Sequence, residues 1–589
     1  MRQLKNVWIL SFECAGVVKV GGLGEAVYNI AKHLANKGLD VTLFIPSHGA
    51  HRNFELMERL KLKSSSHVIN GIIQSKDFLP YKAPFKYKIG VYEGWLENFK
   101  ITLFYGLNTA TSQILDDTMV YRVTKIEDKA LLFARGIAGF IQQLQASREK
   151  FPDLVHAHDY HAVPAAVLAK QKFEEYDHKV AMVFTIHLLS GKRVSWKYLC
   201  KDWCGIENKK HPVYLNGLRI MLSHKQLLRK AKLKLETFGA MEAHVITSVS
   251  RNYLHDDVLP QVGMCCKEKA FFHWNGCDWN FILMLQKVLE KYGEDIRKTL
   301  TVNNIERYNL REYFLTRALG NLTQEEPFLE EGKIKETVYE LKYRPFCEKG
   351  KVEPFKDDGP MVLMTGRLTK QKGVDVLFKA IPYVLKHIPN AKFVLLLLPI
   401  EEEINLVKKF AKLAHKYSNS VRIIFGKVPS IYSLAHLASD IFTCPSRWEP
   451  FGIMALEAMA TGNPVIATAT GGLKEIVLDV TQDLENGTGM LIQKNDHKKL
   501  AEAILSLLFV MWISEEMQRS GTLKSDGVSK TAKKIPHRML RSFVLKQPAY
   551  GIRLRENAIR RVEENFRWEK VINMIIDAYR KAGEIVGQL

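Results

Sequence analysis

The 589-residue chain has no stretch that approaches 18 uncharged apolar residues, the length that a helix needs to cross a membrane. The apolar run at residues 393–400 has only the length of a strand and contains Pro399. The first ten residues lead directly into a strand-like run that is too short for a secretion signal. We therefore expect a soluble protein in the cytoplasm.

Cysteine is scarce and scattered, with eight residues in the whole chain. Cys200 and Cys204 have no second pair of cysteines or histidines at zinc-finger spacing, which argues against a structural zinc site. The adjacent Cys265 and Cys266 could form a redox pair, but two reduced core thiols are the more ordinary outcome in a cytoplasmic protein.

Acidic residues are outnumbered by basic ones: 63 Asp and Glu against 85 Lys and Arg give a net charge of +22. This excess favours an anionic ligand such as a nucleotide sugar, an acidic surface or a nucleic acid. The basic residues are dispersed, and no helix-turn-helix, zinc-finger or RNP pattern is present, so we expect no nucleic acid partner. Hydrophobic residues make up 47% of the chain, enough for two large domains with ordinary cores.

Short apolar runs alternate with helical patterns twice along the chain. The first series begins with a strand at residues 7–12, a helix at 22–37 and a strand at 41–46, and the second begins at residues 361–367. Strands that alternate with helices indicate a parallel sheet that is covered on both faces. The predicted fold class is therefore α/β, with two doubly wound Rossmann-like domains facing each other across a cleft. Other strand-like runs lie at residues 154–158, 180–187, 244–250, 391–398, 421–426, 440–445 and 463–469.

We place the first domain at residues 1–273 and the second at residues 274–568, with an amphipathic C-terminal helix at 569–589. Two stretches of the second domain do not fit the alternation and are interpreted as insertions without an assigned role. Residues 281–356 are charged and rich in helical patterns. Residues 512–549 carry many Lys, Arg and Ser residues without clear periodicity, which is typical of a surface loop.

Two carboxylates, Glu449 and Glu457, flank the start of a predicted helix in the second domain. The strand at 440–445 ends at a proline, so Glu449 lies on the loop that leads into the helix at 454–460, and Glu457 about two turns along it. Ligands of open α/β sheets bind at such carboxyl ends of strands, where two acceptors could bind the hydroxyls of a hexose and a ribose. The alternative is a first-turn glutamate that suits the helix dipole and an exposed one farther along.

Glycine turns and cations follow other predicted strands. Lys19 precedes Gly21 and Gly22 after the first strand, where glycines allow backbone N–H groups to approach a phosphate. Arg367 and Lys372 occupy the matching place in the second domain and suit a diphosphate. The alternatives are a tight strand–helix connection and a solvated basic turn. A third glycine turn holds Thr470, Gly471 and Gly472.

Histidines gather at two strand ends of the first domain. His187 ends one strand, and Asp159 follows His156 and His158 at the end of another. Three histidines and an aspartate within residues 156–161 could suggest a metal, but His156 and His158 share one strand face and no distant acidic cluster completes a site. We expect no metal there, and a strand-end histidine is most often structural.

Together and in this order, these motifs resemble the glycogen and starch synthases, which are retaining glucosyltransferases of the GT-B type. The resemblance covers residues 1–280, 358–510 and 566–569, and its details are nearest the archaeal branch. It depends on Lys19-x-Gly-Gly-Leu, Arg367-x4-Lys372, Glu449-x7-Glu457 and Thr470-Gly-Gly-Leu, with support from Pro46-Ser-His-Gly, Phe184-Thr-Ile-His and Asn275-Gly-Cys-Asp.

The sequence departs from the family pattern in two places. After His187 the bacterial enzymes usually have Asn and an aromatic-Gln-Gly stretch, whereas this chain has Leu-Leu-Ser-Gly-Lys-Arg at residues 188–193. The residue after Pro450 is Phe451, where bacterial forms commonly have cysteine. Family contacts made by residues 188–193 are therefore not carried over to this chain.

The resemblance implies that the second domain binds the nucleotide sugar and that the first lies on the acceptor side, with the last helix returning to the first domain. Glu449 would hold the donor glucose and Glu457 the ribose hydroxyls. His187 would contact the glucose 6-hydroxyl, and Asp159 would lie on the acceptor side. The backbone that also holds the donor glucose would come from Phe451, Gly452 and Ile453.

The implied reaction transfers glucose from ADP-glucose or UDP-glucose to the non-reducing end of an α-1,4-glucan, with retention of configuration. Arg367 and Lys372 would neutralise the leaving diphosphate, aided by Lys19 and Thr470, so neither a metal nor a cofactor is expected. Two alternatives stay open: another retaining GT-B transferase of mannosyl or sucrose type, and a catalytically silent glucan-binding protein.

Overall fold

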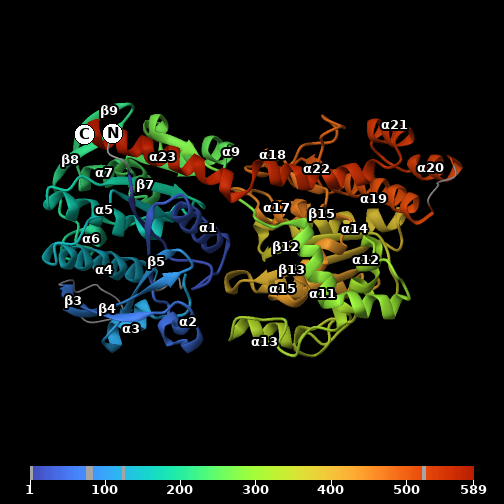
Figure 1. Cartoon of the computed structure of the whole chain (residues 1–589), viewed down its shortest axis with the longest axis horizontal. Coiled ribbons are helices and arrows are strands. Elements are labelled where there is room, and N and C mark those ends of the chain that lie inside the picture. The colour runs from blue at the N-terminus through green and yellow to red at the C-terminus, as the bar shows by residue number, and fades with distance from the viewer. Residues whose placement is uncertain (1–3, 74–83, 122–125, 521–524, 589) are drawn as a thin grey trace. The chain divides into compact units, whose positions relative to one another are not determined.

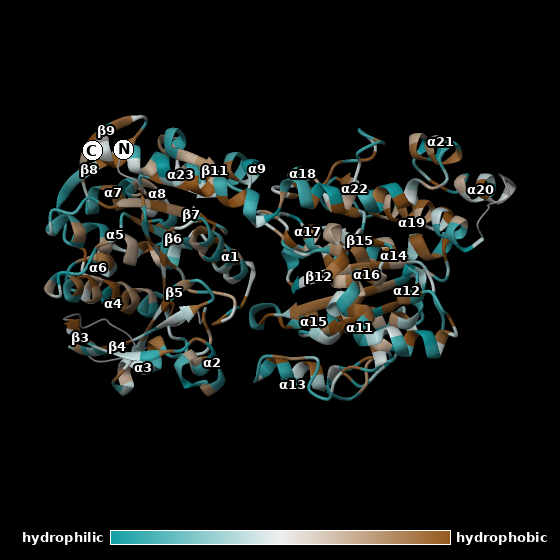
Figure 2. Cartoon of the chain, in the orientation of Figure 1, coloured by the Kyte–Doolittle hydropathy of each residue, from teal (hydrophilic) through white to brown (hydrophobic). Residues whose placement is uncertain are grey.

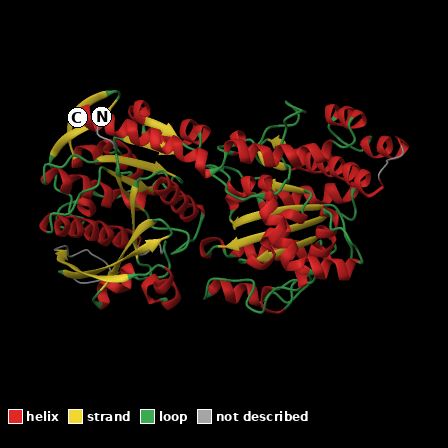
Figure 3. Ribbon diagram, viewed as in Figure 1, coloured by secondary structure: helices red, strands yellow, loops and turns green. Residues whose placement is uncertain are grey.

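The computed structural model describes residues 4–73, 84–121, 126–520 and 525–588. The chain forms two compact units. Unit 1 comprises Met1–Gly276 and Trp568–Leu589, and unit 2 comprises Cys277–Arg567. Each unit is a largely parallel sheet with helices packed around it (Figure 1, Figure 3). The prediction of two doubly wound α/β units is confirmed.

The sheet of unit 1 has nine strands in the order β11-β10-β7-β6-β1-β2-β5-β4-β3. β4 pairs antiparallel with β3 and β5, and the other neighbours are parallel. The chain starts in the middle at β1, winds outward through β2, and returns to the other side of β1 as β6, so the winding reverses between β1 and β6. The strands are β1 (Asn6–Leu10), β2 (Asp40–Pro46), β3 (Lys63–Ile73), β4 (Phe85–Leu96), β5 (Phe99–Gly106), β6 (Leu154–His158), β7 (Ala181–Ile186), β10 (Val245–Ser248) and β11 (Ala270–Phe272).

Helices cover this sheet, and a two-stranded hairpin, β8 (Lys210–Leu215) with β9 (Leu218–Ser223), lies outside it. The described helices of unit 1 are α1 (Gly22–Asn36), α2 (Phe54–Arg59), α3 (Thr109–Leu115), α4 (Ile126–Ala146), α5 (Asp159–Glu175), α6 (Trp196–Leu199), α7 (His224–Lys230), α8 (Leu235–Glu242), α9 (Arg251–Tyr253), α10 (Leu259–Val262) and α23 (Trp568–Gln588).

The C-terminal helix α23 is part of the core of unit 1. Trp568 and Tyr579 are almost fully buried, within one apolar cluster that includes residues of α1 and of the central strands. The hydroxyl of Tyr579 lies 2.8 Å from Nδ1 of His156 on β6. The last helix of the chain therefore returns to the first unit, as the fold prediction requires. Figure 2 shows that the apolar residues gather on the strands inside each unit.

Unit 2 contains a six-stranded parallel sheet in the order β14-β13-β12-β15-β16-β17. Its winding reverses between β12 and β15. The strands are β12 (Met361–Leu368), β13 (Lys392–Pro399), β14 (Val421–Phe425), β15 (Ile441–Cys444), β16 (Val465–Thr468) and β17 (Gly489–Ile492). The described helices are α11 (Phe281–Leu300), α12 (Arg307–Thr316), α13 (Lys333–Tyr339), α14 (Val374–His387), α15 (Asn405–Lys416), α16 (Pro429–Ala438), α17 (Ile453–Ala460), α18 (Leu473–Ile476), α19 (His497–Ser520), α20 (Ser525–Ala532), α21 (Arg538–Lys546) and α22 (Tyr550–Asn565).

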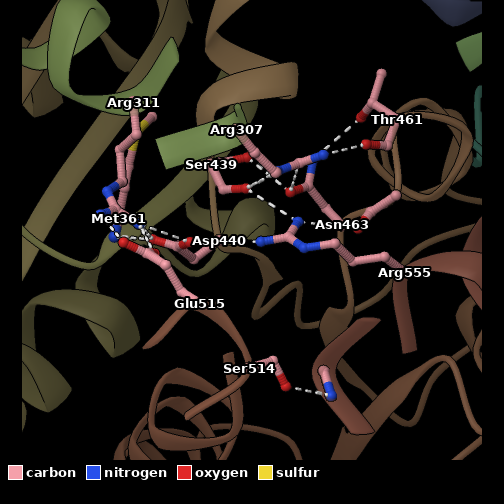
Figure 4. Close-up of polar contacts among 12 residues, drawn as sticks. Arg307, Arg311, Met361, Ser439, Asp440, Thr461, Asn463, Ser514, Glu515 and Arg555 are labelled. Carbon is pink, nitrogen blue, oxygen red and sulfur yellow. Dashed lines mark hydrogen bonds and ion pairs between the residues drawn. The ribbon is translucent and has the colours of Figure 1, made fainter. Parts of the chain in front are cut away.

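Helix α12, from the first expected insertion, is anchored inside unit 2 by Arg311 (Figure 4). The buried guanidinium of Arg311 binds Asp440, which directly precedes β15, at 3.1 Å, Glu515 of α19 at 2.6 Å, and Asp358 at 2.8 Å. Asp440 also accepts the N–H of Met361 at the start of β12. The network therefore fastens α12 and α19 to the amino ends of the two central strands.

The interpretation of residues 512–549 as a loop is wrong for the residues that the structure describes there; residues 521–524 lie outside them. The segment contains the end of α19, then α20 and α21. Leu540 and Val544 are fully buried, one turn apart on α21. Because basic and polar residues surround these two positions in the sequence, the apolar stripe of a short helix was not apparent. No helix in the described part of the chain has the length and apolar character of a membrane span.

Candidate active site

The predicted donor-side residues of unit 2 gather at one edge of the sheet, where β12, β15 and β16 end. Arg367 lies near the end of β12, and Lys372 lies in the turn that follows it. Glu449 lies on the loop after β15, and Glu457 lies about one turn along α17 rather than two. This edge is at the reversal point of the sheet, the usual ligand site of open α/β folds.

A buried ion pair joins the turn after β12 to the loop after β15. Nζ of Lys372 lies 2.6 Å from Oε2 of Glu449, and the hydroxyl of Ser446 donates to the same oxygen at 3.1 Å. Lys372 and Glu449 are both buried. The family resemblance places the two residues on different parts of the donor, whereas in the structure they are ion-pair partners.

The glycine turn after β16 supports the Glu449 loop by close packing. A Cβ at Gly471 would lie 1.9 Å from the carbonyl oxygen of Glu449, and one at Gly472 would lie 2.5 Å from Cα of Phe451. The N–H of Gly472 donates to the carbonyl of Glu449 at 3.2 Å. No side chain larger than hydrogen fits at either glycine, so this turn fixes the backbone that carries Glu449. Thr470, which begins the turn, is buried.

Phe451, Gly452 and Ile453 form the entry to α17. Gly452 is the residue before the helix and has a φ of +116°, a conformation that glycine adopts without strain. The N–H groups of the first helical turn have no partner within the helix and face the start of the helix, where positive potential favours an anion or a hydroxyl oxygen.

Arg367 differs from Lys372 because no described residue forms a hydrogen bond or ion pair with its guanidinium. Its side chain is half-buried on β12. A cation without an internal partner at a strand end is available to an anionic ligand.

Tyr432 of α16 is a candidate site residue that could not be predicted from the sequence. Its hydroxyl donates to Oε2 of Glu457 at 3.0 Å. Burial, together with the charge of Glu457, raises the pKa of Tyr432 well above its ordinary value. Its ring packs edge-on against Trp279 at 5.8 Å. No local pattern in the sequence pairs Tyr432 with Glu457, because the two residues lie 25 positions apart.

In unit 1, the glycine turn after β1 is organised by Glu13. One carboxylate oxygen of Glu13 accepts the N–H groups of Val20 at 2.7 Å and Gly21 at 2.8 Å, and the hydroxyl of Tyr121 donates to the other. These turn amides therefore bind an internal carboxylate. Gly22 begins α1, and Lys19 pairs with Glu25 at the surface, 2.6 Å away.

Asp159 holds the backbone of His187. The aspartate lies in the left-handed conformation (φ +59°) at the start of α5. Its Oδ1 accepts the N–H of His187 at 2.7 Å and that of Leu188 at 3.1 Å. Burial raises the pKa of Asp159 to about 7, although these two hydrogen bonds oppose the shift.

In the segment after His187, where the sequence departs from the family, successive backbone N–H groups donate to side chains of unit 1. The N–H of Leu189 donates to the hydroxyl of Tyr253 at 3.0 Å, and those of Ser190 and Gly191 donate to Glu236 at 2.8 and 3.1 Å. Glu236 is buried on α8. The unusual sequence therefore forms a fixed loop. Glu236 could not be predicted as a partner of this loop, because it lies 45 residues from Gly191 in the sequence.

The two histidines of β6, His156 and His158, form hydrogen bonds with other residues of unit 1. Nε2 of His156 lies 2.6 Å from the hydroxyl of Thr185, opposite its contact with Tyr579. Nδ1 of His158 lies 2.9 Å from Nε2 of His187. Burial lowers the pKa of His187 to about 3 and that of His158 well below its ordinary value, so both rings are neutral at pH 7.

One other group of possible metal ligands occurs among the described residues: His211, His224 and Glu242, whose ligand atoms lie within 4.8 Å of one another. The two imidazole rings are stacked, 4.0 Å apart and inclined by 24°. Nε2 of His211 lies 2.8 Å from one carboxylate oxygen of Glu242, and Nε2 of His224 lies 3.8 Å from the other. The ammonium of Lys170 lies 3.5 Å from Glu242. The group is a buried charge network.

Two doubly wound units, with Arg367, Lys372 and the buried Glu449 at the reversal point of the second sheet, fit the GT-B class of glycosyltransferases, and the comparisons with known proteins assign the chain to it. Residues 347–514 match the family described as "Glycosyl transferases group 1", and residues 6–268 match "Starch synthase catalytic domain". The chain belongs to the glycogen and starch synthase family, and it is a hexosyltransferase.

Individual relatives agree with this assignment. The glycogen synthase of Exiguobacterium sibiricum is 24% identical over 85% of this chain and 90% of its own length, and that of Kosmotoga olearia is 23% identical over 85% and 89%. The catalytic domain of starch synthase IV from Arabidopsis thaliana, solved with ADP and acarbose, has the same fold, with a TM-score of 0.65, 18% identity and 99% coverage of both chains. The sucrose-phosphate synthase of Thermosynechococcus elongatus gives a TM-score of 0.51 at 17% identity, with 98% coverage of both chains.

Proposed function

We propose that this enzyme is a glycogen synthase that transfers glucose from ADP-glucose or UDP-glucose to the non-reducing end of an α-1,4-glucan, with retention of configuration. The observation that carries the proposal is the Lys372–Glu449 ion pair at the reversal point of unit 2, together with Arg367 at the end of β12, which has no partner among the described residues. Such an edge combines cations for a diphosphate with a carboxylate for sugar hydroxyls. Relatives that are named glycogen synthases over most of the chain support the choice of substrate.

In unit 2, Arg367 and Lys372 bind the diphosphate of the donor, aided by Thr470 in the turn of Gly471 and Gly472. Glu449 accepts hydrogen bonds from hydroxyls of the donor glucose. It also forms the ion pair with Lys372. The N–H groups at Phe451, Gly452 and Ile453 also contact the glucose. Glu457, oriented by Tyr432, accepts the hydroxyls of the ribose.

In unit 1, the resemblance assigns His187 to the donor glucose and Lys19 to the diphosphate, whereas in the turn of Gly21 and Gly22 the N–H of Gly21 donates to Glu13. Asp159 belongs to the acceptor side, where it also fixes the backbone of His187. A neutral imidazole suits the contact of His187 with the donor glucose, because a cation beside an electron-poor sugar carbon would oppose the reaction.

The proposed residues stabilise the charges that develop during transfer of the glucose. As the glycosidic bond breaks, negative charge grows on the diphosphate and positive charge on the sugar ring. The guanidinium of Arg367 and the ammonium of Lys372 stabilise the former, and the carboxylate of Glu449 stabilises the latter. The departing phosphate takes the proton of the acceptor hydroxyl on the same face of the sugar, which retains the configuration.

An assay with both donors tests the proposal. Purified enzyme is incubated with glycogen and either ADP-glucose or UDP-glucose carrying a radioactive sugar. We expect label in the polymer with at least one donor, and its release by a hydrolase specific for α-1,4 bonds. Failure to label glycogen with either donor, or transfer to a small acceptor alone, would overturn the assignment to glycogen synthesis.

A further inference from the structure

The pair of neutral histidines at the ends of β6 and β7 leaves one question of chemistry open: which ring donates. Each ring carries one proton, on either Nδ1 or Nε2, and the two rings meet through Nδ1 of His158 and Nε2 of His187, 2.9 Å apart. Either His158 donates from Nδ1, or His187 donates from Nε2. The two arrangements present opposite chemistry at the remaining nitrogen of His187.

The other nitrogen of His158 distinguishes them. Nε2 of His158 is buried and has no hydrogen-bond partner among the described residues. If His187 were the donor, His158 would accept at Nδ1 and carry its own proton on Nε2, as a buried N–H without an acceptor. A buried donor without an acceptor is costly, and buried orphan N–H groups are rarer than orphan acceptors.

The neighbouring rings do not change this choice. The ring of His156 lies 4.0 Å away but is occupied by Thr185 and Tyr579. Nε2 of His273 is likewise buried without a partner, so no hydrogen bond joins it to His158. His158 therefore keeps its proton on Nδ1 and donates to Nε2 of His187.

The consequence falls on Nδ1 of His187. With Nε2 accepting from His158, the single proton of the neutral His187 ring must be on Nδ1. That atom has no partner among the described residues either, but, unlike Nε2 of His158, it is not among the fully buried atoms without a partner, so its N–H can donate to water or a ligand. The backbone N–H of His187 is fixed on Asp159. We propose that His158 is a positioning residue that sets the tautomer of His187, so that His187 presents a neutral N–H donor to an oxygen of the donor sugar. The identity of that ligand rests on the proposed function, whereas the tautomer does not.

Side-chain NMR of the full-length protein, labelled with ¹⁵N-histidine and free of substrate, tests the tautomer directly. A His187→Gln variant assigns the signals. We expect His187 at pH 7 to show a protonated Nδ1 and an unprotonated Nε2. A protonated Nε2, or a charged ring, would overturn the inference, whatever the enzyme transfers.

Two substitutions at His158 test its consequence for the reaction. Asparagine can place an amide N–H close to the position of Nδ1, whereas leucine removes the donor. We expect His158→Asn to keep the tautomer and to retain kcat within about 3-fold, and His158→Leu to lose the fixed tautomer and lower kcat about 10-fold or more with little change in KM for glucan. Equal kcat in the two variants, with the same His187 spectrum, would overturn the inference. Correct spectra without any transfer of glucose would instead contradict only the proposed function.

Discussion

At the scale of single residues, the candidate site combines one cation that is bound internally with one that is not. Lys372 is buried against Glu449, whereas Arg367 has no partner among the described residues. The two cations should therefore respond differently to substitution, since removing one partner of a buried pair leaves the other charge without compensation.

Glu449→Gln should both inactivate and destabilise the enzyme. Loss of the carboxylate leaves the Lys372 ammonium buried and unpaired, at a cost of about 3–5 kcal/mol, and removes charge stabilisation that contributes about 100-fold or more to turnover. The double variant Glu449→Gln/Lys372→Met should regain most of the lost melting temperature and remain inactive. Calorimetry and donor assays check both. Near-normal turnover in folded Glu449→Gln would remove this carboxylate from the mechanism.

Arg367→Ala should lower turnover without affecting stability. Charge on the diphosphate grows in the transition state, so we expect kcat to fall about 100-fold while KM for the donor changes less. The exposed Arg580, paired with Asp577 on α23, gives a control of equal charge change: Arg580→Ala should keep full activity. A higher KM with unchanged kcat would show that Arg367 acts only in ground-state binding.

Asp159→Asn should remove part of the pH dependence of stability. A carboxyl titrates near pH 4 in the unfolded chain and at about 7 in the fold, so its contribution is fully present below about pH 4 and is lost as the pH rises through 7. Asparagine keeps the acceptor for His187 and Leu188 but does not titrate. The melting temperature of the variant, relative to wild type, should therefore increase from pH 5 to pH 8. A constant difference would contradict the raised pKa.

At the scale of elements, strand ends could be predicted from the sequence and their internal partners could not. Lys19, Arg367 and Glu449 follow apolar runs that are visible locally. Glu13, Glu236 and Tyr432 act on backbone or carboxylates up to 46 residues away, and nothing in their own surroundings reveals this. Helix α21 was missed for a related reason, because two apolar residues among basic ones form a stripe only once the helix packs.

Leu540→Ala tests whether α21 belongs to the core. Leu540 is fully buried, so the substitution should reduce the stability of unit 2 by about 2–5 kcal/mol with little change in kcat. Its neighbour Met539 is 55% exposed, and Met539→Ala should change stability by less than about 0.5 kcal/mol. Deletion of residues 515–546 should yield insoluble protein, because it also removes Glu515 from Arg311. A soluble, active deletion variant would restore the loop interpretation.

At the scale of the whole molecule, unit 2 has its buried ion network and its candidate site at opposite ends of the same strands. In unit 2, the Arg311 network ties α12 and α19 to the amino ends of β12 and β15, and the candidate site occupies their carboxyl ends. The network therefore joins Arg311 and Glu515, one from each expected insertion, at the strand ends opposite the candidate site. In unit 1, α23 closes the core, so the C-terminus of the chain contributes to the stability of the first unit.

The net charge of +22 suggests a final test, on how the enzyme neutralises its diphosphate. We expect full activity in excess chelator, because the proposed site offers Arg367, Lys372 and Lys19 for the same oxygens that a divalent ion would bind. A metal would have to displace these cations or be repelled by them. Donor assays in EDTA, with the Arg367→Ala variant alongside, measure this. A large loss in EDTA that manganese or magnesium restores would contradict the assignment of the diphosphate to these side chains, whereas rescue of Arg367→Ala alone by added magnesium would support it.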